Sequence, residues 1–171
     1  MVFLKFCDVY AKILNRILTV LGVSLIIAVS LQIAGRYVPF IPLWLWPLEL
    51  TNFSLIWAIF IGSVVALRDK EHFNVDIFTM ALGEKRANDP RLLMFFNILY
   101  YFIGFSMTVI FTYYGYYYFL QWGAIQVSDI TGINLGWLYI SVPLAGVSWA
   151  VFLIEGVLRD LFKITLSKEG N

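Results

Sequence analysis

Charged residues are scarce in this chain. They make up 13% of its 171 residues, whereas soluble domains carry roughly 25%. Hydrophobic residues make up 61%, which is more apolar surface than a soluble domain of this size can bury. The shortage of charge therefore excludes an ordinary water-soluble protein, and lipid must solvate part of the surface. A net charge of only +1 gives no reason to expect a nucleic-acid partner.

Cysteine and histidine are almost missing, with one residue of each, Cys7 and His72. One cysteine excludes an internal disulfide. One cysteine and one histidine are too few ligands for a zinc site, and one histidine excludes a haem held between two helical histidines. A Ser-His-Asp assembly would need His72, and the chain has no nucleophile elbow. We therefore expect no enzyme activity, no metal and no cofactor. We read Cys7 as an unreactive thiol, with palmitoylation or a redox role as alternatives.

The chain instead contains long runs of uncharged residues. Residues 50–67 are neutral, and 18 helical residues rise ~27 Å, about the thickness of a bilayer's hydrocarbon core. We expect an all-α integral membrane protein that forms one domain over residues 1–171. Its four transmembrane helices are predicted at about 17–37, 47–67, 92–122 and 135–158. Residues 1–16 are predicted to form an amphipathic helix at the membrane surface that bends or runs on into the first span, and 73–82 a second short amphipathic helix.

Prolines mark several of the expected helix boundaries. Pro39 and Pro42 stop the first span, and Pro47 suits the first turn of the second. Asp89 and Pro90 read as the N-cap and first position of the third helix. Pro143 lies inside the fourth span, where we expect it to bend the helix.

Lysine and arginine are distributed very unevenly between the two sides of a four-span protein. Eleven of the twelve lie in residues 1–16, in residues 68–91 or after residue 158, and Arg36 alone lies on the other side. Positively charged loops stay in the cytoplasm, so both termini are predicted to be cytoplasmic. The tyrosines near the end of the third span then fit an outer aromatic belt, with a sugar or cation site as the alternative.

Ionisable side chains are nearly absent from the predicted spans. A translocated polar solute needs polar partners at mid-depth, and the scattered Gln32, Asn52, Ser54, Asn97 and Ser106 form no convergent cluster. The bare spans indicate a protein that packs against another membrane protein.

Two groups of charges near the span ends are candidate interaction residues. Arg36 ends the first span and Glu49 begins the second, so antiparallel helices bring them to one depth, where we expect them to pair with each other or with a partner subunit. Arg68, His72 and Asp76 recur every four residues, so a continuing helix puts them on one face that could bind another protein.

An ordered set of residues between 30 and 80 resembles a known family. The sequence AGRYV (34–38) is followed by a short Trp/Pro-rich loop, then by Glu49, Trp57 and Gly62, and then by ALRDKEHFNVD (66–76). This order is similar to that of the small membrane subunit, the DctQ-like subunit, of TRAP (tripartite ATP-independent periplasmic) transporters. Chain length and the four expected spans agree with it.

The resemblance implies a non-catalytic subunit in a bacterial inner membrane. It implies a heterodimer with a large multi-span subunit that carries the substrate and sodium sites, and a periplasmic binding protein that delivers an organic acid, for which we favour sialic acid over a C4-dicarboxylate. The small subunit would extend the scaffold of the large one and help to dock the binding protein. Carried over by position, the structural or subunit-interface residues are Arg36, Glu49, Trp57, Gly62, Arg68, His72 and Asp76.

Two other functions compete with this one. A self-sufficient proton-coupled transporter, acting as a homo-oligomer, would use Glu49 as its proton acceptor. A membrane enzyme or respiratory subunit would need a bound cofactor.

Overall fold

The computed structural model describes residues 2–40, 42, 44–69 and 90–169. The described chain forms four long helices, α1 (Val2–Tyr37), α2 (Trp46–Arg68), α5 (Pro90–Trp122) and α7 (Ser141–Glu169), and one short helix, α6 (Gly136–Tyr139). Four helices in the described residues are long and apolar enough to cross a membrane. The predicted fold class, an all-α protein with four spanning helices, is confirmed.

The N-terminal residues do not form a separate surface helix. Residues 2–37 are one continuous helix of 36 residues, so the segment predicted at 1–16 runs on into the first span, which is one of the two predicted alternatives. No proline interrupts this stretch, and the inward side of its first turns, with Cys7, Ala11 and Leu14, is buried in the protein core. Because other helices bury the apolar face of this segment, the face does not need to be covered by lipid at the membrane surface. The second predicted surface helix, 73–82, lies outside the described residues.

α2 follows its prediction closely. It begins one residue before Pro47, which lies in the first turn, and it ends at Arg68. Glu49 in the first turn and Arg68 in the last each lie at the helix end whose dipole favours their charge. α5 begins at Pro90 and ends at Trp122, within two residues of the predicted third span.

The fourth span is interrupted before its proline. α6 ends at Tyr139 and α7 begins at Ser141, with Ile140 between them in a nearly helical conformation (φ −67°, ψ −18°). Pro143 therefore lies in the first turn of α7, where its missing N–H costs little. The helix is therefore broken three residues before Pro143, close to where the proline was expected to bend it.

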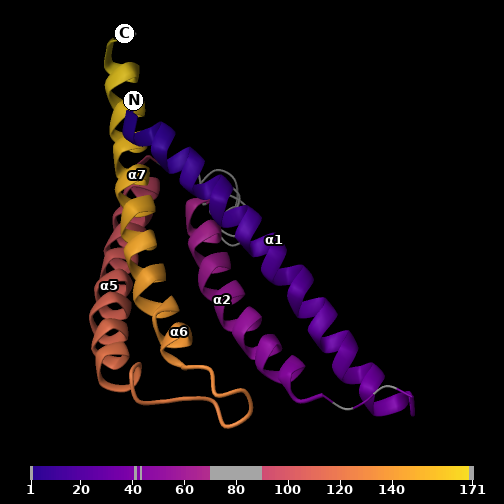
Figure 1. Cartoon of the computed structure of the whole chain (residues 1–171). Helices are drawn as coiled ribbons and strands as arrows, with labels where there is room; N and C mark the ends of the chain where they lie inside the picture. The colour runs from indigo at the N-terminus through magenta and orange to yellow at the C-terminus, as the bar shows by residue number, and fades with distance from the viewer. Residues whose placement is uncertain (1, 41, 43, 70–89, 170–171) are drawn as a thin grey trace.

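The long helices form two antiparallel pairs that meet along α2 and α7. α1 packs on α2, α5 packs on α7, and α2 packs on α7. Both ends of the chain lie at the same end of the bundle, which we call the terminal end; the opposite end, with residues 38–40, 44–45 and 123–135, is the loop end (Figure 1). α1 and α7 approach each other at the terminal end and separate toward the loop end (Figure 1).

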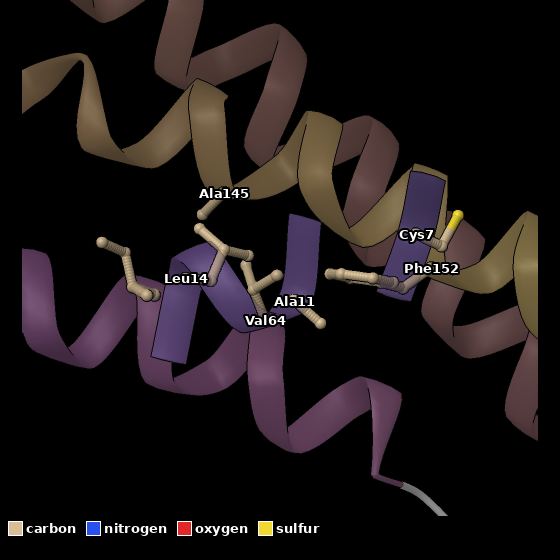
Figure 2. Packing of buried hydrophobic residues seen from close by; sticks show 7 residues of the cluster. Cys7, Ala11, Leu14, Val64, Ala145 and Phe152 are labelled. Carbon is tan, nitrogen blue, oxygen red and sulfur yellow. The ribbon is translucent and has the colours of Figure 1, made fainter. Parts of the chain in front are cut away.

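The buried apolar core lies where α1, α2 and α7 meet. Figure 2 shows Cys7, Ala11 and Leu14 of α1 with residues of α2 and α7 around them. Val64 comes from α2, and Ala145 and Phe152 come from α7. Small residues of α1 let the three helices approach closely at this point.

Glycines allow α5 and α7 to pack tightly. A Cβ on Gly104 would lie 2.9 Å from Leu153 Cδ2, and one on Gly115 would lie 2.8 Å from Val142 Cγ1. From the other helix, a Cβ on Gly146 would lie 3.0 Å from the backbone nitrogen of Thr112. Glycines on both helices therefore receive side chains of the other helix, as is typical of close helix pairs in membranes.

Candidate functional site

Arg68 joins α2 to two other helices at the terminal end. Its Nη2 donates to Asp8 Oδ1 on α1 and lies 3.2 Å from Glu155 Oε1 on α7, while its Nε lies 3.2 Å from Glu155 Oε2. The fork of the guanidinium thus binds both oxygens of one carboxylate, the strongest geometry available to this pair. Arg68 Cζ also lies 5.4 Å from the ring centre of Phe152, a cation–π contact.

Arg159 completes a network of four charges. Its Nε and Nη2 donate to Glu155 Oε1 over 2.9 and 2.7 Å, and its Nη2 also donates to Asp8 Oδ1 over 3.2 Å. Glu155 is only 2% exposed, so its charge is almost fully removed from solvent. Two arginines and two acids balance in formal charge, which is what a buried carboxylate requires. We call Asp8, Arg68, Glu155 and Arg159 the ion network.

A polar cavity of about 450 Å³ adjoins the ion network, and α5 contributes to its lining. Tyr101 donates its hydroxyl to Asp160 Oδ2 over 2.6 Å, and Tyr100 donates its hydroxyl to the carbonyl of Leu67 over 3.2 Å. The ion network and these tyrosines bring all four long helices together at one level. This region has the strongest electrostatic contacts of the described chain between residues distant in sequence.

The loop end has a second polar site around Glu49. Thr131, in the connection between α5 and α6, donates its hydroxyl to Glu49 Oε2. Arg36 is exposed at the end of α1, and no ion pair joins it to Glu49 in the described part of the chain. The expected pairing of Arg36 with Glu49 is therefore not formed among the described residues, where Glu49 binds Thr131, and pairing of either residue with a partner subunit stays a prediction.

The remaining predicted site residues have different environments. Trp57 donates its Nε1–H to the carbonyl of Trp137 over 3.1 Å and so links α2 to α6. A Cβ on Gly62 would meet only Leu18 Cδ1, at an ordinary 3.8 Å, so this glycine is not required for close packing inside the chain. His72 and Asp76 lie outside the described residues, and the face that they are predicted to share with Arg68 stays a prediction.

Sequence reasoning missed three members of the ion network, Asp8, Glu155 and Arg159. Glu155 stands in a strongly apolar stretch near the end of the fourth predicted span, and an ionisable residue in such a place indicates a nearby partner. Arg68 stands at the corresponding depth at the end of the second span. Their matching depth and opposite charges are compatible with a pair, but depth alone does not identify the partner.

Three pairs of polar side chains join neighbouring helices, whereas the buried polar atoms of Thr108, Thr112 and Trp149 have no hydrogen-bond partner among the described residues. Ser24 bonds Ser54 over 2.8 Å, Gln32 donates to Thr51 over 2.7 Å, and Tyr10 bonds Ser148 over 2.6 Å. Each pair links two different helices, and such bonds contribute about 0.6 kcal/mol on average in membranes. These groups stabilise the bundle.

The comparisons with known proteins agree with the residue pattern. A family model described as "Tripartite ATP-independent periplasmic transporters, DctQ component" matches residues 25–163, well over half of the chain. The match covers α2 and α5 entirely, most of α7 and the second part of α1. A comparison with curated proteins finds no match.

Proposed function

The chain belongs to the family of DctQ components of tripartite ATP-independent periplasmic transporters, and we propose that it acts as a non-catalytic scaffold. As a small membrane subunit it would pack against the large multi-span subunit as a heterodimer. It would also help to dock the periplasmic binding protein. The chain is a multi-pass membrane protein, and we propose the bacterial inner membrane as its location, with both termini cytoplasmic.

The observation that carries this proposal is the division of polar and apolar groups. Several polar side chains of α1, α2 and α7 bond a neighbouring helix, as in Ser24–Ser54 and Gln32–Thr51. Large apolar side chains of α5, by contrast, remain more than half exposed along one side: Phe95, Ile98, Phe102, Val109, Tyr113 and Tyr116. A helix with such a face must lie against lipid or another membrane protein. This supports a packing role over a solute-binding role.

We propose that the transport chemistry belongs to the partner subunit. Sodium coupling and the substrate site would lie in the large subunit, and this chain would work without a cofactor of its own. The imported compound would be an organic acid, with sialic acid favoured over a C4-dicarboxylate.

The competing self-sufficient transporter receives no support from the position of Glu49. The residue lies in the first turn of α2 and accepts a bond from Thr131 at the loop end. A proton acceptor that alternates between two sides of a membrane is expected nearer to mid-depth.

Reconstitution into liposomes tests the proposal. Vesicles that contain this chain alone should show no uptake of labelled sialic acid or labelled succinate under an inward sodium gradient. Vesicles that also contain the large subunit and the binding protein should accumulate one of the two compounds. Uptake by the chain alone, abolished by Glu49→Gln, would overturn the scaffold proposal and favour the self-sufficient transporter.

A further inference from the structure

The connection between α5 and α6 forms a small, well-bonded hairpin at the loop end. Ser128 N–H donates to the carbonyl of Ile133 over 2.8 Å, and Leu135 N–H donates to the carbonyl of Gln126 over 3.0 Å. Gly132 has a φ of +71°, which a glycine adopts without strain in such a turn. These backbone bonds give the hairpin, residues 126–135, a defined shape.

A crevice of about 300 Å³ separates this hairpin from the first turns of α2. We call it the loop-end crevice. Apolar side chains such as Leu48, Ile133 and Leu138 form its walls, and its polar groups include the carboxylates of Glu49 and Asp129. No lysine or arginine is among its lining residues in the described chain. The crevice is therefore apolar along its walls and negatively charged.

Both carboxylates have capacity for a further partner. Thr131 donates to Oε2 of Glu49, and Oε1 accepts no bond from the described residues. Asp129 is exposed, and its side chain accepts no hydrogen bond in the described part of the chain. A carboxylate accepts several hydrogen bonds, so both residues can still bind a cationic group.

The chemistry of the crevice selects one kind of occupant. A metal ion requires several ligands, and the described residues contain no group of three or more His, Cys, Asp or Glu arranged to hold one. A lysine or arginine side chain matches both features, because its aliphatic stem packs on apolar walls while its charged head binds carboxylates. Charge complementarity therefore favours a basic side chain of a protein that docks at this end.

We propose that the loop-end crevice receives a lysine or arginine side chain of the soluble substrate-binding protein. The inference rests on the proposed function, since it assigns the loop end to the side from which that protein approaches. It adds a specific contact: Glu49 and Asp129 on this chain against a basic residue on the binding protein.

The test measures binding of the binding protein encoded beside this chain to the purified complex of both membrane subunits. Glu49→Gln, Asp129→Asn and the double variant are compared with wild type at about 0.05 M and 0.5 M salt. We expect the double variant to bind about 10-fold more weakly at low salt, mainly through slower association. The difference should shrink at high salt, because ions screen exposed charges over a few ångströms.

Asp69→Asn is the matched control, because Asp69 is an exposed acid at the terminal end. Its binding should equal that of wild type. Asp129→Lys should weaken binding beyond Asp129→Asn, and a Lys→Glu or Arg→Glu change in the binding protein should restore it. Because Asp129 has no side-chain bond to lose, these variants separate charge from folding.

The possible failures are distinguishable. If wild-type complex does not bind the binding protein at either salt concentration, the docking part of the proposed function is wrong. If wild type binds and the Glu49→Gln/Asp129→Asn variant binds equally well at low salt, docking stands and the loop-end crevice is not the contact.

Discussion

Glu155 carries the most deeply buried charge among the described residues. Its carboxylate is 2% exposed and is bound by the guanidinium groups of Arg68 and Arg159, at distances from 2.7 to 3.2 Å. Burying an ion pair gains little net stability, but removing one member leaves the other charge buried and unpaired. The bundle is therefore expected to be sensitive to loss of the buried member of the ion network, Glu155.

Glu155→Gln should destabilise the chain by about 3 kcal/mol, since it leaves Arg68 without its bidentate partner. Thermal unfolding of the protein in detergent measures the loss. Arg159→Gln is the comparison, because Arg159 is 46% exposed and solvent replaces much of its pairing. Its effect should stay within about 1 kcal/mol. Equal losses of stability for Glu155→Gln and Arg159→Gln would mean that the burial of a side chain does not determine the free-energy cost of replacing it.

A double-mutant cycle on Arg36 and Glu49 should show additive effects. The two residues form no ion pair, so the free energies of unfolding lost by Arg36→Ala and Glu49→Ala should sum in the double variant to within about 0.5 kcal/mol. The Glu49/Thr131 cycle, by contrast, should be non-additive because their side chains bond. Chemical unfolding of each variant measures both cycles.

The sequence predicts how deep each charged residue lies in the membrane, but it does not predict which side chains these residues contact. Arg68 bonds within the chain, and its partners Asp8 and Glu155 lie 60 and 87 positions away. A hydropathy pattern places each charge along its own helix. It does not say how a uniformly apolar helix is rotated or which helix lies beside it.

The positions at which α2 and α5 begin and end agree with those expected from the local sequence. The bounds of α2 and α5 agree with the prediction to within two residues, because prolines and charges mark their ends. The break at Ile140 lies three residues before Pro143, so it too has a local cause in the sequence. The burial of the first turns of α1 depends instead on the neighbouring helices that cover them, and a single helix's sequence does not contain that information.

Helix contacts predict a clear difference between two glycines. Gly146→Ala should weaken the α5–α7 contact by about 1–3 kcal/mol, since the new methyl group meets the backbone of Thr112. Gly22→Ala should be neutral or slightly stabilising, since a Cβ there meets nothing within 4 Å and alanine favours the helix. Unfolding of both variants in mixed detergent compares them. A larger loss at Gly22 would contradict the packing described for α5 and α7.

For the whole molecule, the described helices bring both chain ends to one side. Lys5, Arg68 and Arg159 lie at this end, which supports the proposal that it is cytoplasmic. Which side of the membrane each end faces is directly measurable, because Lys5 and Ile125 are exposed at opposite ends of the bundle.

Cysteine labelling tests this orientation. In intact cells with a permeable outer membrane, a membrane-impermeant maleimide should modify Ile125→Cys and leave Lys5→Cys unmodified. Inside-out vesicles should show the reverse. Cys7 is fully buried, so the unmodified chain provides the background. Labelling of Lys5→Cys in intact cells would reverse the orientation.

The divergence of α1 from α7 has a consequence for the bilayer itself. Helices that touch near the chain ends and spread apart toward the opposite side occupy unequal areas in the two leaflets (Figure 1). One copy surrounded only by lipid would crowd one monolayer more than the other and favour local curvature. A neighbouring protein that is broad where this chain is narrow would relieve that lateral stress. The bilayer would therefore favour assembly of this chain with such a protein.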